Sequence, residues 1–160
     1  MLLLSIHPRF ARMILSGEKT VELRRRAPRR PPEFWVALYA TAPVCAVIGI
    51  VRACEVLVGR PDDLWSRVGC ESGLGREEYR SYFGDTGRAV GIRLVDPVPF
   101  ERPVRLDTLR TNWPGFNPPQ SFSYLTEERR DDLLAHSSGK SPHELPTVPS
   151  DYKLCNGLHF

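Results

Sequence analysis

The pattern of apolar and polar residues at the start of the chain predicts a strand, a helix and a second strand. Residues 2–6 form a nearly continuous apolar run, which is typical of a short buried strand. Pro8 suits the first turn of a helix, because its missing N–H would have no partner there. Apolar residues then recur at helical spacing until Gly17, which suits the left-handed cap of a helix. The second strand is expected at residues 20–24.

This second strand alternates between apolar and polar residues. Val21 and Leu23 fall on one face, and Glu22 and Arg24 fall together on the other. If the apolar face packs on the core, the carboxylate and the guanidinium project from the strand side by side.

The rest of the pattern predicts three more strands and three more helices. The apolar runs are long enough for the interior of a small barrel. We therefore expect an α+β, mainly β fold: a small β-barrel with flanking short helices. The predicted strands are 34–40, 44–58 and 89–95, and the predicted helices are 61–68, 76–83 and 124–136.

Prolines multiply after residue 95, and the chain beyond residue 136 resembles a linker in composition. We place the domain boundary near residue 105. Residues 1–105 would form the barrel domain, and residues 106–160 a proline-rich C-terminal extension with one helix.

Composition narrows the class of protein. A chain of 160 residues with 41% hydrophobic and 26% charged residues is typical of one globular domain. The apolar start is too short for a membrane span and lacks the basic flank of a signal peptide, so we expect a cytoplasmic protein. The four cysteines show no CxxC spacing and the four histidines are scattered. Neither a metal nor another cofactor is predicted, and Cys45 and Cys54 are expected to be reduced core thiols.

Positive charge is concentrated at the N-terminal end. Residues 1–30 hold eight basic and two acidic residues, a balance of +6, although the whole chain has a net charge of +3. The proline-rich basic segment 25–33 is expected to be an exposed loop, in which the arginines would contact a nucleic-acid backbone. The alternative is a chance cluster, since arginine is abundant throughout. The arginines concerned are Arg25, Arg26, Arg29 and Arg30.

The first part of the chain resembles the ASCH domain family of the PUA-like superfamily. The family signature GxKxxExR is matched by Gly17, Lys19, Glu22 and Arg24. The order of the surrounding strands and helices is similar as well, and the resemblance covers roughly residues 1–100. It implies a PUA-like β-barrel with a cleft that binds RNA or a nucleotide-like small molecule.

In such a cleft, Arg24 would bind a phosphate or carboxylate, and Glu22 would accept hydrogen bonds from a base or amide. The resemblance also places two residues at the end of a strand, Tyr39 and Thr41, near the cleft. The full set of expected ligand-binding residues is Gly17, Lys19, Thr20, Glu22, Arg24, Tyr39 and Thr41.

An enzyme is the alternative to a binding module. Lys19 is one of only three lysines among 22 basic residues, and a desolvated lysine can serve as a base or nucleophile. Some members of the family are amidohydrolases that act on N4-acetylcytidine, with a threonine at the position of Glu22 and a glutamate from a later loop. Lys19 and Glu22 would be the catalytic residues here, of an amidohydrolase or a nuclease, and Glu71 is only a loose match to the later glutamate.

Less specific interpretations of several features remain open. Lys19 could be a surface lysine neutralised by Glu22, and the chain could be a regulatory protein-interaction domain that uses its extension and the 124–136 helix. Trp113 is either a loop anchor or a platform for stacking a base. His7 is either a helix cap or a cleft residue.

Overall fold

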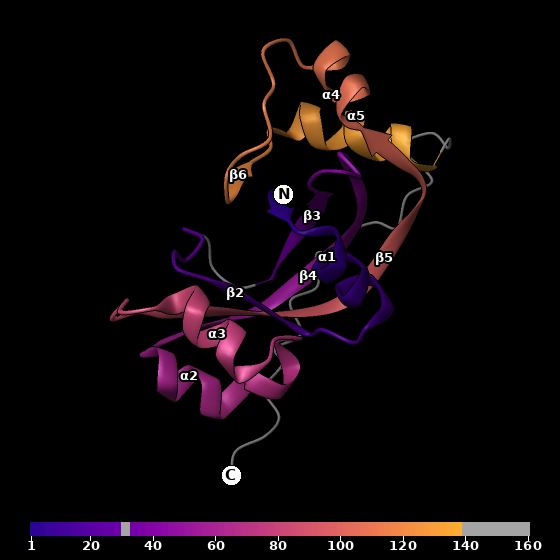
Figure 1. The fold of residues 1–160 in the computed structure, drawn as a ribbon. Coiled ribbons are helices and arrows are strands. Elements are labelled where there is room, and N and C mark those ends of the chain that lie inside the picture. Colours follow the sequence, from indigo (N-terminus) through magenta and orange to yellow (C-terminus); the bar gives the residue numbers. More distant parts are fainter. Residues whose placement is uncertain (30–32, 139–160) are drawn as a thin grey trace.

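The computed structural model describes residues 1–29 and 33–138. The helices and strands follow the order expected of a mixed α+β fold, with most of the strands contributed before residue 106 (Figure 1). The elements are β1 (Leu2–Ile6), α1 (Pro8–Ser16), β2 (Val21–Arg24), β3 (Phe34–Ala40), β4 (Ala46–Gly59), α2 (Pro61–Val68), the 3-10 turn η1 (Gly69–Glu71), α3 (Arg76–Phe83), β5 (Ala89–Arg105), α4 (Leu106–Asn112), β6 (Phe122–Tyr124) and α5 (Glu127–Ser138).

All described strands belong to one six-stranded sheet with the order β2-β5-β4-β3-β1-β6. The pair β1 and β3 is parallel, and the other pairs are antiparallel. Register shifts interrupt the pairing of β4 with β5 at three places, and such irregularities bend a sheet. The sheet is therefore curled rather than flat.

The curl brings the two ends of the strand order together. Arg24 of β2 donates a hydrogen bond to the carbonyl oxygen of Ser5 in β1, at 2.8 Å. The backbone N–H of Arg29, shortly after β2, donates to the hydroxyl of Tyr124 in β6 at 2.6 Å. The β2 edge of the sheet and the segment after it thus reach β1 and β6 at the other edge, which gives a half-barrel and confirms the predicted fold class.

Strand β5 differs from the prediction, which ended it at residue 95. It continues to Arg105 in spite of three prolines, because only Val90–Arg93 of this strand pair with β2. Beyond them no other described strand pairs with this side of β5, and proline is tolerated at such an edge since no ladder donor is needed there. The last predicted helix also begins later than expected, at Glu127, because residues 122–124 form β6.

Three apolar clusters fill the fold. The first lies between α1 and the sheet and contains Leu4, Ile14 and Val36, and the third lies under α2 and α3. The second is covered by α4 and α5 and joins Leu3 to Leu133. Residues 106–138 therefore pack on the same sheet as the rest, and the domain division at residue 105 stays a prediction.

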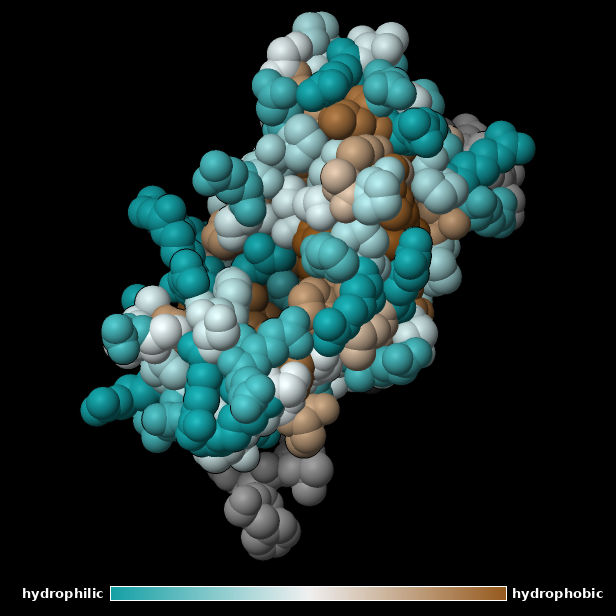
Figure 2. Space-filling view, in the orientation of Figure 1, coloured by the Kyte–Doolittle hydropathy of each residue, from teal (hydrophilic) through white to brown (hydrophobic). Residues whose placement is uncertain are grey.

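Hydrophilic residues predominate on the face of the molecule that Figure 2 shows. Among the described residues, no helix is both long enough and apolar enough to span a bilayer. The fully buried Leu133 shows that α5 packs on the second cluster.

Candidate active site

Lys19 lies in the turn that joins α1 to β2. Gly17 ends α1 with a φ of 83°, and its left-handed conformation turns the chain so that the N–H of Lys19 bonds to Met13. The side chain of Lys19 is then drawn inward and is 1% exposed. The interpretation of Lys19 as a surface lysine is therefore wrong.

The ammonium group of Lys19 has a full set of partners. Nζ donates to the carbonyl oxygen of Val21 at 2.7 Å and to that of Ser72 at 2.5 Å. Its third partner is Oε2 of Glu22, at 3.2 Å. Because an ammonium has three N–H donors, all of them are used within the protein. In this arrangement Lys19 holds the site together rather than presenting a free donor.

Burial lowers the pKa of Lys19 from its ordinary value of 10.5, and the positive charge of Arg24 lowers it further. The carboxylate of Glu22 opposes this shift. Since two carbonyl oxygens and a carboxylate surround Nζ, the protonated form satisfies every acceptor in the cluster.

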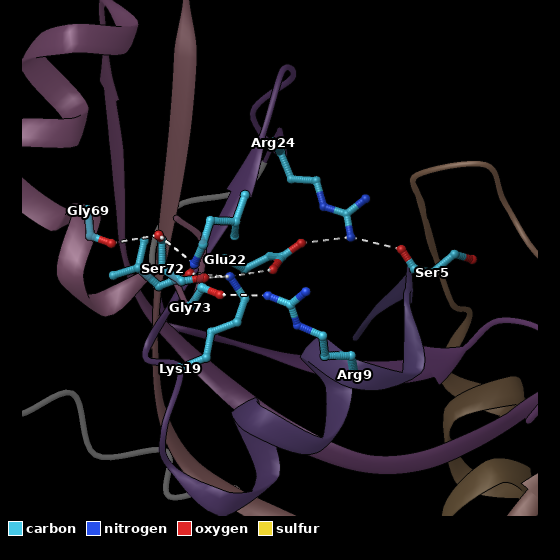
Figure 3. A network of polar contacts seen from close by, with 10 residues as sticks. Ser5, Arg9, Lys19, Glu22, Arg24, Gly69, Ser72 and Gly73 are labelled. Carbon is cyan, nitrogen blue, oxygen red and sulfur yellow. Dashed lines mark hydrogen bonds and ion pairs between the residues drawn. The ribbon is translucent and has the colours of Figure 1, made fainter. Parts of the chain in front are cut away.

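Glu22 is held between two cations. Its Oε2 faces Lys19, and its Oε1 lies 2.9 Å from a terminal nitrogen of Arg24 (Figure 3). Arg24 is 8% exposed and extends across to β1, where it bonds to the Ser5 carbonyl oxygen. Its Nε is buried and has no hydrogen-bond partner among the described residues. A buried N–H without a partner is costly, and two other buried groups, the Ser5 hydroxyl and the Trp35 indole N–H, share this condition among the described residues.

These three side chains line a cavity of about 190 Å³. Phe10 from α1 and Tyr82 from α3 contribute aromatic surface to it. The centre of the Phe10 ring lies 5.3 Å from Nζ of Lys19. Burial raises the pKa of Tyr82, so its phenol stays a hydrogen-bonding group at neutral pH. The lining residues are Ser5, Ile6, His7, Phe10, Lys19, Glu22, Leu23, Arg24, Leu74 and Tyr82.

Both interpretations of His7 hold at once. It is the N-cap of α1, with Nδ1 accepting from the N–H of Arg9, and it also lines the cavity. Ser5, Phe10, Leu74 and Tyr82 were not anticipated from the sequence as cavity residues. Phe10 has the helical spacing of a core residue, and nothing in the sequence near Tyr82 links it to Glu22.

Glu71 lies close to Thr20 but outside the set of cavity residues. Its Oε2 accepts a hydrogen bond from the Thr20 hydroxyl at 3.1 Å and forms an ion pair with Arg93. Arg93 also pairs with Glu55 at 3.0 Å. Glu71 is thus engaged beside the turn, and neither it nor Thr20 is among the residues that line the cavity.

Tyr39 and Thr41 are not among the lining residues either. Tyr39 is buried in the second apolar cluster, under α4 and α5, and Thr41 accepts backbone hydrogen bonds from Val44 and Cys45. Gly17 shapes the turn without lining the cavity. Their assignment as ligand contacts stays a prediction.

In the basic segment after β2, one arginine contacts the rest of the protein and two others are exposed to solvent. Arg25 donates to the carbonyl oxygen of Tyr82 and lies over its ring at 5.0 Å, so it supports the cavity wall. Arg26 and Arg29 are exposed. Arg30 lies outside the described residues. Across residues 1–29 and 33–138, no group of three or more His, Cys, Asp or Glu side chains is arranged to hold a metal ion.

Comparisons with known proteins identify close relatives. The chain is 40% identical, over 135 residues, to an ASCH domain-containing ribonuclease of Zymomonas mobilis subsp. mobilis, covering 84% of this chain and 90% of the relative. The crystal structure of ASCH from Zymomonas mobilis is 39% identical with a TM-score of 0.82, covering 86% of this chain and 95% of that chain. No family model matches the chain.

More distant structures share only the fold. The N-terminal domain of Staphylothermus marinus McrB has a TM-score of 0.54 at 13% identity, over 84% of this chain and 92% of that chain.

Proposed function

Because this chain belongs to the ASCH domain family, we propose that it is a ribonuclease that binds one nucleotide of RNA in the cavity lined by Lys19, Glu22 and Arg24. The relative that is 40% identical is named a ribonuclease, and this chain covers 90% of its length. The single observation that carries the proposal is the buried carboxylate of Glu22, paired with Arg24 at the wall of a cavity that Phe10 and Tyr82 also line.

The side chains of Glu22 and Arg24 suit the needs of RNA cleavage. The reaction requires a group that accepts the proton of the attacking hydroxyl and donors that stabilise the charge growing on the phosphate. Glu22 is the carboxylate at this cavity, and Arg24 is the guanidinium beside it. Lys19 acts as a positioning residue, because its three N–H groups are used to fix Glu22 and the loop at Ser72.

The aromatic residues suit the base of the same nucleotide. A cavity of about 190 Å³ is of the size of a single planar base with some solvent, and aromatic side chains stack on bases of any sequence. Phe10 and Tyr82 would supply this apolar contact. Arg26, Arg29 and, by its place in the sequence, Arg30 would contact the RNA backbone, while Arg25 supports Tyr82.

An amidohydrolase acting on an acylated nucleoside is supported less well. It would require a second carboxylate at the cavity, whereas Glu71 is engaged by Thr20 and Arg93 outside the lining set. Its lysine would also need a free pair of electrons, and all three N–H groups of Lys19 have acceptors.

The test is cleavage of a short single-stranded RNA by the full-length protein and by Glu22→Gln. Removing the proton acceptor should lower the cleavage rate by about 100-fold or more, the usual contribution of a general base. Glu18→Gln is the matched control, because it makes the same change of charge at an exposed position in the same turn.

Three results would decide the question. DNA of the same sequence should not be cleaved if the attacking group is the 2′-hydroxyl. Equal rates for Glu22→Gln and wild type would contradict the assignment of Glu22. Wild-type protein that leaves RNA intact but hydrolyses N4-acetylcytidine would favour the amidohydrolase instead.

A further inference from the structure

The N-terminus of α1 lies at the cavity and carries a histidine to which the proposed cleavage chemistry assigns no part. His7 lines the cavity and is exposed to solvent. Its Nδ1 accepts a hydrogen bond from the backbone N–H of Arg9 at 3.2 Å. Among the described residues, its second nitrogen, Nε2, has no hydrogen-bond partner.

The cap decides which nitrogen carries the proton. Since Nδ1 accepts a hydrogen bond, a neutral imidazole must carry its proton on Nε2. The ring is also steadied by an edge contact with Phe10, with the ring centres 6.2 Å apart. Nε2 is therefore a hydrogen-bond donor of fixed direction.

Other donors face the same cavity. Arg24 lines it, is 8% exposed, and has a buried Nε–H without a partner among the described residues. The phenol of Tyr82 lines the cavity, and burial raises its pKa. The positive end of the nine-residue helix α1 lies there as well. The carboxylate at the cavity, Glu22, is already paired with two cations. This excess of donors favours an anionic group of the ligand.

We infer that Nε2–H of His7 donates a hydrogen bond to a phosphate oxygen of the RNA nucleotide whose base enters the cavity. The inference rests on the proposed ribonuclease function and assigns a phosphate subsite at the start of α1. His7 is a binding residue in this arrangement, and its helix cap keeps the donor aimed.

The test separates the imidazole from the cap. Asparagine is among the best N-cap residues, so His7→Asn keeps the cap and removes the Nε2 donor. His7→Ala removes both. Binding is measured with a short single-stranded RNA carrying 2′-fluoro sugars, which cannot be cleaved through a 2′-hydroxyl. We expect both variants to lose about tenfold in affinity, as for one hydrogen bond to a charged group. Only His7→Ala should lower the melting temperature.

A second measurement identifies the group that His7 contacts. Each phosphate of the same RNA is replaced in turn by an uncharged methylphosphonate. For the wild type, one position should weaken binding more than the others. In His7→Asn, the additional loss at that position should disappear, because the donor that sensed the charge is gone.

The outcomes are distinguishable from failure of the proposed function. Wild-type protein that cleaves RNA, with His7→Asn binding equally well, would overturn the phosphate subsite and leave the ribonuclease proposal standing. The phosphate subsite is also overturned if His7→Asn weakens binding but the methylphosphonate effect is unchanged. Wild-type protein that neither binds nor cleaves RNA would overturn both.

Discussion

Two regions of the molecule bury polar groups, and they do so in different ways. Under α4 and α5, the indole N–H of Trp113 donates to Asp132 at 2.8 Å, and Trp113 itself packs in the second apolar cluster. Near α1 and β2, Lys19, Glu22 and Arg24 are buried together beside a cavity. We call these regions the Trp113 anchor and the Lys19 network.

The two regions differ in the surroundings of their buried polar groups. At the Trp113 anchor, the indole has its partner, and the aromatic ring fills apolar space against Phe116. In the Lys19 network, three charged side chains line a cavity, and the Nε–H of Arg24 has no partner among the described residues. A satisfied buried polar group stabilises the fold, whereas charged side chains gathered at a cavity are typical of a ligand site. Trp113 is therefore a loop anchor rather than a platform for a base.

The largest effect is expected from Lys19→Met. It would leave Glu22 with one cation and two carbonyl oxygens without a donor, and breaking a buried ion pair costs about 3–5 kcal/mol. Urea unfolding measures the loss, and RNA cleavage should disappear with it. The exposed change Glu18→Gln should alter the stability by less than about 0.5 kcal/mol. A loss for Lys19→Met no larger than this control would contradict the account of Lys19 as the organiser of the network.

Leu133→Ala should come next. Leu133 is fully buried in the second cluster, and such truncations cost about 2–5 kcal/mol through lost contacts and the cavity left behind. Because this residue lies in the Trp113 anchor region, the cleavage rate of the folded protein should stay unchanged below the unfolding transition. A selective loss of cleavage would show that the two regions are coupled.

Asp132→Ala should destabilise the fold by about 1–2 kcal/mol, since the buried N–H of Trp113 loses its acceptor. The neighbouring change Asp131→Ala removes an exposed carboxylate and serves as the control. Thermal unfolding measures both variants. RNA affinity should be the same in each, and equal stability of the two would count against the anchor.

Arg26→Ser should act on binding alone. Removing one exposed arginine that contacts the RNA backbone should weaken affinity a few-fold. It should also reduce the slope of the logarithm of the binding constant against the logarithm of the salt concentration, by about 0.7 per phosphate contact for a single strand. Arg129→Ser removes a charge from the Trp113 anchor, where Arg129 lies 5.4 Å over the indole ring, and should leave the slope unchanged. Anisotropy titrations at several salt concentrations compare them.

The smallest effect at neutral pH is expected from Tyr39→Phe. Burial raises the pKa of Tyr39 from 10.0 to about 12, so its contribution to stability is complete below pH 10 and is lost as the pH rises toward 12. The variant should lose less stability over this range than the wild type does. Tyr79, whose pKa is also about 12, preserves part of the dependence in both proteins.

The same variant tests whether Tyr39 touches the ligand. Since Tyr39 lies in the second cluster, RNA binding by Tyr39→Phe at neutral pH should match the wild type. A clear loss of affinity would restore Tyr39 as a ligand contact.

The sequence by itself determined the local features of the site. Pro8 and Gly17 set the bounds of α1, because a missing N–H and a left-handed φ are properties of single residues. The alternation in β2 placed Glu22 and Arg24 on one face, since successive side chains of a strand point to opposite sides. The family signature was readable for the same reason, as its residues lie within eight positions of one another.

Only the tertiary structure decided what those residues contact. Ser72, 53 residues after Lys19, supplies a carbonyl oxygen that turns an expected base or surface charge into a buried, fully bonded ammonium. Tyr82 reaches the cavity from α3, and β6 pairs with β1 although Phe122–Tyr124 lie far from Leu2–Ile6 in the sequence. Pairings between distant segments leave no periodic signal in the sequence, because they depend on how the sheet curls. The curl brings β2 to β1 through Arg24 and thereby forms the cavity.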